Sequence, residues 1–459
     1  MRILTINSGS SSLKFQVFDW TEQNVLAVGV VERIGQEESW IKYRAHGRRV
    51  SDKVRCPDAR EAVRLACALL TDPEKGVVSS LDGIAAVGHR VSHGGEYFLR
   101  SAIVDDDVLR KLREIIPLAP LHLPANIAGI EEAKRLMPRA AHTITVDTAW
   151  HQTMPRYASL YAVPQAWYMD WRVRRYGFHG TSFLYCARRA ALLLGKANEE
   201  LNAVICHIGN GASACAVRNG VSFDTTMGFT PQEGLIMGTR SGDIDPSVIP
   251  YVMEKSGLSA REVDSMLIRE SGLKGICGYV DRRDIQWWAS QGDDLSALAI
   301  QMECYRLKKA IGGLMAALGR VDCIVFTAAA GEMCALLREK SLEGLEGFGV
   351  RLDPVKNEAC HCRDGEFDIT AEGSRVRVLI IPTDEEMVIT EDAWALLHGC
   401  YEEHTHFQYS FERPGYVNKG RQRALKKVLA KEPGLAAYIA GPARIQQEEQ
   451  DGKPLADTE

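Results

Sequence analysis

The chain has 459 residues, of which 46% are hydrophobic and 25% are charged, and its 55 basic and 60 acidic residues give a net charge of −5. This composition predicts a folded protein with a large core and excludes disorder for most of the chain. The net negative charge argues against broad electrostatic binding of nucleic acid, although it allows a local basic cleft for a phosphorylated ligand.

The sequence carries no signal for export or for membrane insertion. The opening residues MRILTINSGSSSLKF lack the apolar stretch of a signal peptide, and no run approaches the roughly 18 apolar residues that cross a bilayer. The 12 cysteines include no C-x-x-C pair. We interpret them as reduced thiols of a cytoplasmic protein that has no membrane partner.

A strand–loop–strand pattern opens the chain and returns near its middle. The apolar run RILTIN, the loop NSGSSS and the alternating run LKFQVFD predict two strands joined by a polar loop. AVICHI, GNGAS and ACAV repeat this order between Ala203 and Val217, and a turn follows at Asn219-Gly220. The repeat is weak evidence for an internal duplication into two related α/β halves.

Two further strands are predicted to run into loops. VDCIVFT leads into the loop AAAGEM and then a helix near Cys334, and VRVLIIP leads into the acidic loop TDEE. Helical patterns cover residues 107–116, 128–136, 182–194, 259–271 and 295–318. Strands alternating with helices predict α/β architecture. ALKKVLAK predicts one more short helix, and we expect residues 446–459 to be disordered.

Several loops carry groups suited to phosphate, because glycine admits close backbone contact and free N–H groups and hydroxyls can donate to oxygen. The residues concerned are Ser10, Ser12, Lys14, Asn210, Gly211 and Ser213. No loop contains the G-x-x-x-x-G-K-[ST] pattern of a P-loop, and each one taken alone is better explained as a hairpin turn.

Four stretches that carry charged or imidazole groups, three of them with glycine, favour a functional interpretation. They are VGHRVSHGGEY with Arg90, TVDTAWHQTMP with Asp147, RRYGFHGTS with His179, and MGFTPQEGLIMGTRSGDIDP with Arg240. Charged and imidazole groups in such loops are poorly explained as helix surface, and each loop offers a cation or donor compatible with phosphate.

In these stretches, and in HIGNGAS, VFTAAAGE and IPTDEE, the sequence resembles the acetate kinase family. The resemblance implies a duplicated actin-like ATPase (ribonuclease H-like) fold with two α/β domains around a central cleft. It also implies that residues 1–149 and 386–459 form the N-terminal domain. Residues 150–385 would then carry the nucleotide site and the contacts of a homodimer.

The family moves the γ-phosphoryl group of ATP reversibly onto acetate or a similar short-chain carboxylate. A carboxylate with a pKa near ~4 is already ionised at neutral pH, so the reaction needs charge neutralisation and alignment more than a strong base. By resemblance, Arg90 and Arg240 would hold the carboxylate and the transferring phosphoryl group. His179 would donate to that group, and Asp147 would orient an arginine and the metal-bound waters.

The resemblance assigns the remaining site residues as follows. The phosphates and nucleotide would lie along Ser10, Ser12, Lys14, His207, Asn210, Gly211, Ala329, Ala330 and Gly331. The acyl group would contact Ser92, Leu121, Phe178 and Pro231. Asn7 and Glu385 would hold Mg²⁺ or Mn²⁺, and the choice of Glu385 over Glu386 depends on the alignment.

The sequence departs from the family pattern in two pockets. TAAAGEM replaces the usual TAGIGEN of the adenosine loop, which removes an isoleucine contact with the base and adds a Cβ at Ala329. Ser92 replaces a valine of the acyl pocket, and Leu123, Phe183 and Thr226 are smaller departures.

ATP and a short acid remain the leading expectation, and two alternatives stay open. One is a pyrophosphate-dependent kinase or a kinase of propionate or another short acid. The other, of a different class, is a weakened nucleotide-binding regulatory paralogue.

Overall fold

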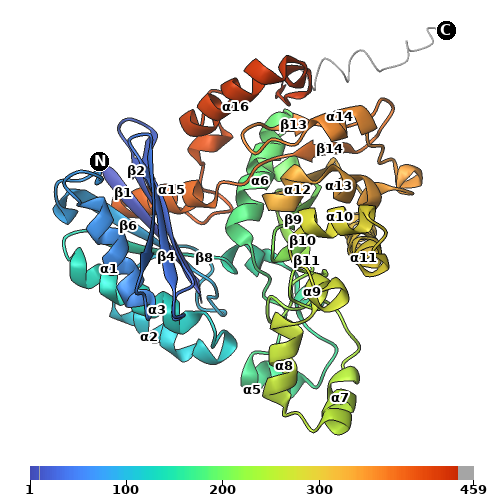
Figure 1. Cartoon of the computed structure of the whole chain (residues 1–459), viewed down its shortest axis with the longest axis horizontal. Coiled ribbons are helices and arrows are strands. Elements are labelled where there is room, and N and C mark those ends of the chain that lie inside the picture. The colour runs from blue at the N-terminus through green and yellow to red at the C-terminus, as the bar shows by residue number, and fades with distance from the viewer. Residues whose placement is uncertain (10, 443–459) are drawn as a thin grey trace. The chain divides into compact units, whose positions relative to one another are not determined.

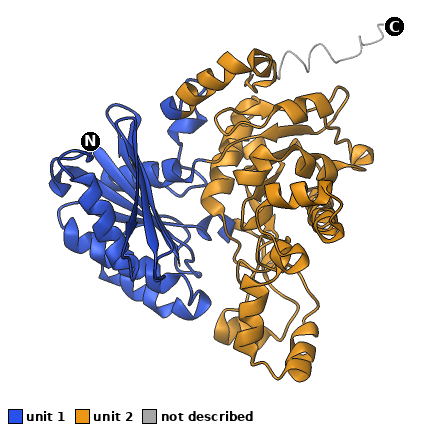
Figure 2. Ribbon diagram, in the orientation of Figure 1, with its two compact units in different colours: residues 1–152, 384–420 blue, residues 153–383, 421–459 orange. Residues whose placement is uncertain are grey.

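The structure is a computed structural model that describes residues 1–9 and 11–442. The chain forms two compact units (Figure 2). Met1–Gln152 and Asp384–Gly420 make unit 1, and Thr153–Thr383 with residues 421–442 make unit 2. Each unit has its own sheet and its own helices, so the predicted α/β class is confirmed.

Unit 1 contains an eight-stranded sheet in the order β5-β4-β3-β2-β1-β6-β8-β7 (Figure 1). Strands β1, β6 and β8 are parallel, and β1 to β5 form an antiparallel meander. The strands are β1 (Arg2–Ser8), β2 (Ser12–Asp19), β3 (Asn24–Glu32), β4 (Ser39–Ala45), β5 (Arg48–Val54), β6 (Ile84–Val91), β7 (Ala102–Ile103) and β8 (Ala141–Val146).

The apolar run at the N-terminus becomes the central strand β1 because both of its faces are buried. Leu4 and Ile6 join a core with residues of α1 and α3, whereas Ile3 packs with Ala393 of α15. The α-helices of unit 1 are α1 (Ala59–Leu70), α2 (Asp106–Glu114), α3 (Leu123–Leu136) and α15 (Glu385–Leu397). Helices therefore cover both faces of the sheet around β1, as expected where parallel strands are buried.

Unit 2 contains a six-stranded sheet in the order β11-β10-β9-β12-β14-β13. Its strands are β9 (Ala203–Ile208), β10 (Ala212–Arg218), β11 (Val221–Thr225), β12 (Cys323–Thr327), β13 (Phe367–Asp368) and β14 (Arg377–Ile380). Its α-helices are α4 (Arg156–Ser159), α5 (Gln165–Trp171), α6 (Gly180–Leu193), α7 (Val248–Ser256), α8 (Ala260–Arg269), α9 (Gly272–Cys277), α10 (Arg282–Ser290), α11 (Asp294–Leu318), α12 (Ala328–Met333), α13 (Ala335–Leu342), α14 (Pro354–Ala359) and most of α16 (Lys419–Lys431).

The two sheets share one plan, which confirms the predicted duplication. The strand set β3-β2-β1-β6-β8 of unit 1 has the same order and the same directions as β11-β10-β9-β12-β14 of unit 2. In both sets three antiparallel strands come first in the chain, and the two strands that follow are parallel to the first of them. Ligands of such sheets bind at the carboxyl ends of the parallel strands, and the loops singled out in the sequence follow these ends.

Two segments predicted as loops are helical instead. AAAGEM forms α12, because alanine is the strongest helix former. Glu385 and Glu386 lie in the first turn of α15, where the Asp384 side chain accepts a hydrogen bond from the N–H of Met387. This cap and the acidic first turn suit a helix N-terminus.

The division of the chain differs from the expected one at its C-terminal end. The crossings between units lie at 152/153 and 383/384, close to the expected 149/150 and 385/386. Residues 421–442 belong to unit 2, although the whole C-terminal segment was expected in unit 1. The reason is apolar burial, because Leu425, Val428, Leu429 and Leu435 pack against the core of unit 2. The disorder expected for 446–459 concerns residues outside those described.

Candidate active site

Three neighbouring strands of unit 1 place a row of polar side chains side by side. Asn7 of β1 pairs with Lys14 of β2 and, on its other side, with Arg90 of β6. Residues at paired positions point to the same face of a sheet. Arg90 Nη1 donates a hydrogen bond of 3.1 Å to Asn7 Oδ1. The pairing thus joins residues that are 83 positions apart in the sequence.

Asp147, which directly follows β8, fixes the guanidinium group of Arg90. Arg90 Nε donates to Asp147 Oδ1 at 2.9 Å and Nη2 donates to Oδ2, so the pair is bidentate. Burial alone would lower the pKa of Arg90, but the charge and hydrogen bonds of Asp147 raise it, and Glu385 and Glu386 add to this effect. The Asp147 side chain is 1% exposed and that of Arg90 is 20% exposed. Arg90 is therefore an oriented cation that still presents surface to a ligand.

The hydroxyl of Ser92, which replaces a family valine, has a partner within unit 1. Ser92 Oγ and the Ser92 N–H both donate to Oδ1 of Asn126, at 3.0 and 3.1 Å. Asn126 Nδ2 in turn donates to the carbonyl of Ser8. The hydroxyl is therefore buried without the penalty of an unsatisfied polar group. Leu121, the other acyl-pocket residue expected in this unit, is 49% exposed.

Acidic side chains gather where α15 begins. Burial raises the pKa of Glu386, and the neighbouring charges of Glu385 and Asp384 raise it further, while Lys14 opposes them. A divalent cation would relieve this repulsion, so the residues fit such an ion. Among the described residues, no group of three His, Cys, Asp or Glu side chains is arranged to enclose a metal. One or two carboxylates together with substrate phosphates would hold it, which is the usual arrangement for Mg²⁺.

In unit 2, two histidine rings stack near the carboxyl end of β9. The rings of His179, at the start of α6, and His207, in β9, lie 4.1 Å apart at an interplanar angle of 17°. Hydrogen bonds of 2.8 Å join His179 Nδ1 to Ser213 Oγ and His207 Nδ1 to Ser182 Oγ. These bonds fix the orientation of both rings.

The loop Gly209–Gly211 lies against His179 and Arg240. A Cβ on Gly211 would be 3.5 Å from His179 Nε2 and 3.7 Å from Arg240 Nη1, so both donors face this loop. Arg282 donates to the carbonyl of Gly209 at 3.0 Å and pairs with Glu303, which holds the loop from behind. The arrangement places a glycine backbone beside an imidazole and a guanidinium group, which are groups suited to binding phosphate.

Arg240 differs from Arg90 in its partners. Its Nη1 donates to the carbonyl of Pro231 at 3.1 Å, and in the described part of the chain no carboxylate pairs with it. Burial lowers its pKa from the ordinary arginine value, although that value is high enough to keep the group charged. Gly238 is required nearby, because a Cβ there would lie 2.1 Å from Asn210 Oδ1.

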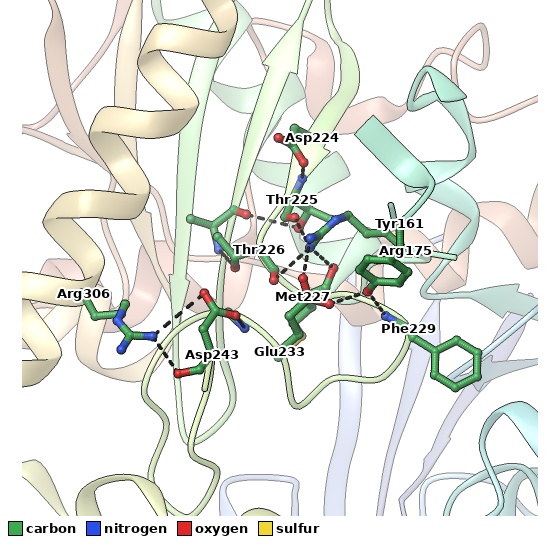
Figure 3. Close-up of polar contacts among 12 residues, drawn as sticks. Tyr161, Arg175, Asp224, Thr225, Thr226, Met227, Phe229, Glu233, Asp243 and Arg306 are labelled. Atoms are coloured by element: carbon green, nitrogen blue, oxygen red, sulfur yellow. Dashed lines mark hydrogen bonds and ion pairs between the residues drawn. The ribbon is translucent and has the colours of Figure 1, made fainter. Parts of the chain in front are cut away.

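A polar cluster around Arg175 supports the chain that leads to Pro231 (Figure 3). Arg175 Nη1 donates to three successive carbonyls, those of residues 225, 226 and 227, at 2.8 to 3.1 Å. Its guanidinium also pairs with Glu233, which accepts a hydrogen bond from the hydroxyl of Tyr161. Thr226, one of the departures from the family pattern, bonds to the backbone: its Oγ1 accepts a hydrogen bond of 3.0 Å from the N–H of Ala214.

The segment expected to form the adenosine loop, which is α12 in the structure, is held by a fully buried arginine. Arg338 donates to the carbonyls of Gly331 and Glu332 at 2.9 and 3.0 Å and is 0% exposed. Burial lowers the pKa of Arg338 to about 10. Of the substituted alanines, Ala329 is exposed and Ala330 is buried. Helix α12 is therefore supported from within by Arg338, while Ala329 faces solvent.

Comparison with known proteins identifies the family. The sequence profile of the Acetokinase family matches residues 2–391. The chain belongs to the acetokinase family.

Its relatives include the acetate kinase of Treponema pallidum (strain Nichols), which is 52% identical over 444 residues, or 96% of this chain and 99% of that one. Among solved structures, the acetate kinase of Porphyromonas gingivalis has a TM-score of 0.81 at 39% identity, covering 86% of this chain and 99% of that one. A propionate kinase from Francisella tularensis subsp. tularensis SCHU S4 has a TM-score of 0.80 at 36% identity, with the same coverage.

Membership in the acetokinase family confirms the duplicated actin-like ATPase fold and shows that this protein is a phosphotransferase of the carboxylate kinase class. The T. pallidum protein matches 96% of the chain, so its similarity extends beyond residue 391, where the family profile ends. None of the helices in the described ranges has the length and apolar character needed to cross a membrane.

The residues predicted from the sequence fall into two sets, one in each unit. Unit 1 brings together Asn7, Lys14, Arg90 and Asp147, with Ser12 at the start of β2. Unit 2 brings together His179, His207, Gly211 and Arg240 with Pro231. Phe178 is 5% exposed and belongs to the core of unit 2, and Ser10 lies outside the described residues.

Sequence analysis missed four residues that support the site: Asn126, Arg175, Arg282 and Arg338. The adjacent arginines in RRYGFHGTS were the one signal available for Arg175. Asn126 and Arg282 bond to groups that are distant in the sequence, and Arg338 bonds to backbone carbonyls, so no local pattern marks them.

Proposed function

We propose that this acetokinase transfers the γ-phosphoryl group of ATP to acetate or a similar short-chain carboxylate, reversibly and by direct in-line transfer. The products are an acyl phosphate and ADP. The observation that carries the proposal is the oriented arginine Arg90, held bidentately by Asp147 and still partly exposed. An ionised carboxylate needs charge neutralisation for this reaction, and a fixed guanidinium supplies it.

The proposed roles follow from the partners of each side chain. Arg90 and Arg240 neutralise the carboxylate and the transferring phosphoryl group, whose transition state spreads negative charge over three oxygens. His179 donates to that group from Nε2, the ring atom that faces Gly211. Asp147 keeps Arg90 in a single orientation, so little reorganisation is needed during transfer.

The nucleotide phosphates lie in this proposal along Ser10, Ser12, Lys14, His207, Asn210 and Gly211, and the nucleoside lies along Ala329, Ala330 and Gly331. The loop at Gly211 supports this assignment, because it combines a glycine backbone with facing donors. The Mg²⁺ or Mn²⁺ ion would be held by Asn7 and Glu385. When bound, such an ion neutralises phosphate charge and aligns the donor.

Acetate is the preferred substrate in this proposal, with propionate as the next acid. The acyl group would contact Ser92, Leu121, Phe178 and Pro231. The Ser92 hydroxyl is engaged by Asn126 rather than directed at a ligand. One methylene changes discrimination by only ~1–3 kcal/mol, so the two acids should differ modestly.

A homodimer in the cytoplasm completes the proposal. Its support is a set of exposed aromatic side chains on unit 2, which are Trp171, Tyr251, Trp287 and Tyr305 at 55 to 63% exposure. Aromatic residues are enriched where proteins associate. Light scattering during size exclusion should give about twice the chain mass, and a monomer would contradict this part.

A trapping assay tests the reaction. Purified protein is incubated with Mg²⁺, hydroxylamine, a panel of carboxylates and either ATP or pyrophosphate. The proposal predicts acyl hydroxamate with ATP and acetate, and none with pyrophosphate. Product with pyrophosphate only would show that pyrophosphate, rather than ATP, is the phosphoryl donor. No product in either direction would favour the nucleotide-binding regulator.

A further inference from the structure

Residues 400–442, here called the C-terminal extension, lie beyond the matched family profile and have no role in the site described so far. One of its side chains reaches the segment that precedes Glu385. Arg421, in the first turns of α16, donates from Nη1 to the carbonyl of Pro382 at 2.7 Å and from Nη2 to the carbonyl of Thr383. Both carbonyls belong to the IPTDEE stretch just after β14.

The same peptide segment is held from the other side by Glu332 of α12. The buried Glu332 carboxylate, 5% exposed, accepts the backbone N–H groups of Ala328 and Thr383. Burial raises the pKa of Glu332, while the charges of Arg421 and Arg363 oppose that shift. Thr383 is therefore fixed at both of its backbone polar groups, its N–H by Glu332 and its carbonyl by Arg421.

These contacts join two elements of the proposed site. Glu332 belongs to α12, the segment after β12 to which the proposed function assigns the nucleoside. Thr383 is covalently linked to Asp384, the cap of α15, and thus to Glu385, the proposed metal ligand. The helix that carries Arg421 is itself anchored, because Leu425, Val428 and Leu429 pack against the core of unit 2. The helix position of Arg421 is therefore fixed, and its side chain can hold the Pro382–Thr383 segment in place.

We propose that Arg421 is a positioning residue for phosphoryl transfer. It fixes the Thr383 peptide, and through it the direction in which the chain continues to Glu385. This inference rests on the proposed function, because it assigns to Arg421 the placement of the metal ligand. The C-terminal extension then supplies a working part of the site, and the affinity for the metal–nucleotide complex depends on it.

Three variants test the assignment. R421A removes both bonds, and R421K keeps the charge but lacks the planar fork that serves two carbonyls. K427A is the matched control, because it removes the same charge from an exposed position of the same helix. Thermal unfolding of each variant checks that it is folded.

The first measurement is hydrogen exchange of a peptide covering residues 380–388, in protein without metal or nucleotide. We expect exchange in this peptide to be at least about 10-fold faster in R421A, intermediate in R421K and unchanged in K427A, with β10 unaffected in all of them.

The second measurement is the rate of acyl phosphate formation as a function of Mg²⁺ at fixed ATP and acetate. We expect R421A to need about 10-fold more Mg²⁺ for half-maximal rate, because supporting partners of metal ligands are typically worth 10–100-fold. The KM for acetate should stay unchanged.

Equal exchange and equal Mg²⁺ dependence in R421A and K427A would overturn the proposal. Faster exchange throughout unit 2 would also overturn it, because Arg421 would then be a general stability element. If R421A does not fold, R421K decides by the same criteria. If the unmodified protein forms no acyl phosphate, the proposed function fails, whereas the exchange experiment still decides whether Arg421 fixes this segment.

Discussion

The corresponding strands of the two units carry different chemistry on the same scaffold. In unit 1 the carboxyl ends of β1, β6 and β8 present Asn7, Arg90 and Asp147, which form a charged, hydrogen-bonded set. In unit 2 the ends of β9 and β12 present His207 and Thr327, which are paired in the sheet register, and His207 is bonded to Ser182 and stacked on His179. A duplicated fold therefore fixes where the site residues lie, while the side chains decide that the strand ends carry an ion pair in unit 1 and an imidazole and a hydroxyl in unit 2.

The two arginines show this difference most clearly. Arg90 is held by a carboxylate, and its pKa is raised by that partner against the effect of burial. Arg240 bonds to the carbonyl of Pro231, and burial lowers its pKa. We infer that Arg90 is the more rigid group and that Arg240 has more of its charge available to an anionic ligand.

The largest expected effect is the loss of either arginine. R90A and R240A should each lower kcat by about 10³-fold, because each removes a cation aimed at developing charge. R90K should be nearly as damaging as R90A, since lysine cannot form the bidentate bond to Asp147, whereas R240K should retain more activity. Steady-state rates from hydroxamate trapping measure this, with circular dichroism as the check on folding. Near-normal kcat in either alanine variant would contradict the role assigned to that arginine.

The next effect concerns the carboxylate that distinguishes unit 1. D147N keeps the shape of the side chain but removes its charge, so the orientation of Arg90 is weakened while the arginine remains. We expect kcat to fall about 10²-fold, which is less than for R90A. A double variant R90A/D147N should be no worse than R90A alone, because the two residues act as one unit. Additive losses would show that Asp147 acts independently of Arg90.

A smaller effect is expected in the nucleoside loop of unit 2. The triple variant A329G/A330I/M333N restores the family residues. It should lower the KM for ATP several-fold, because an isoleucine side chain adds buried apolar area worth about 1–2 kcal/mol. The KM for acetate should not change, and this serves as the internal control. An unchanged or raised KM for ATP would mean that the present loop already contacts the base as well as the family loop does.

The last effect is on the stability of unit 1 rather than on catalysis, because α15 buries the carboxyl group of Glu391. Burial raises the pKa of Glu391 to about 7, and its bonds to Ser410 oppose the shift. A carboxyl whose pKa is raised on folding stabilises the folded state below its unfolded pKa of about 4.3. That contribution is lost as the pH rises through about 7.

E391Q removes this titration. Relative to the unmodified protein, E391Q should gain stability between pH 5 and pH 8 by up to about 3 kcal/mol. Urea unfolding at both pH values measures the difference. A constant difference across this range would show that Glu391 is ionised in the folded protein.

The sequence predicted the parts of the molecule that depend on local pattern. Alternation of apolar residues located the hairpins β1–β2 and β9–β10, and Asn219-Gly220 adopts the positive φ angles of a tight turn. Arg90 and Arg240 were found because charged residues in glycine-containing loops are hard to explain otherwise.

Other parts depend on contacts that no local pattern records. Arg338 and Arg421 bond to backbone carbonyls, and carbonyls leave no trace in a sequence. The alanines of α12 are compatible with a loop and with a helical turn, so the sequence alone did not distinguish the two. The placement of residues after 421 was decided by burial of Leu425 and Leu429 against a core assembled from distant segments.

The central claim is that Arg90 and Arg240 act on one transferring phosphoryl group. A crystal structure with ADP, Mg²⁺, acetate and a planar aluminium fluoride mimic of that group tests it most directly. We predict a guanidinium nitrogen of each arginine within hydrogen-bond distance of the mimic, with Asp147 still bidentate on Arg90. A mimic contacted by one arginine while the other points into a separate region would contradict the account.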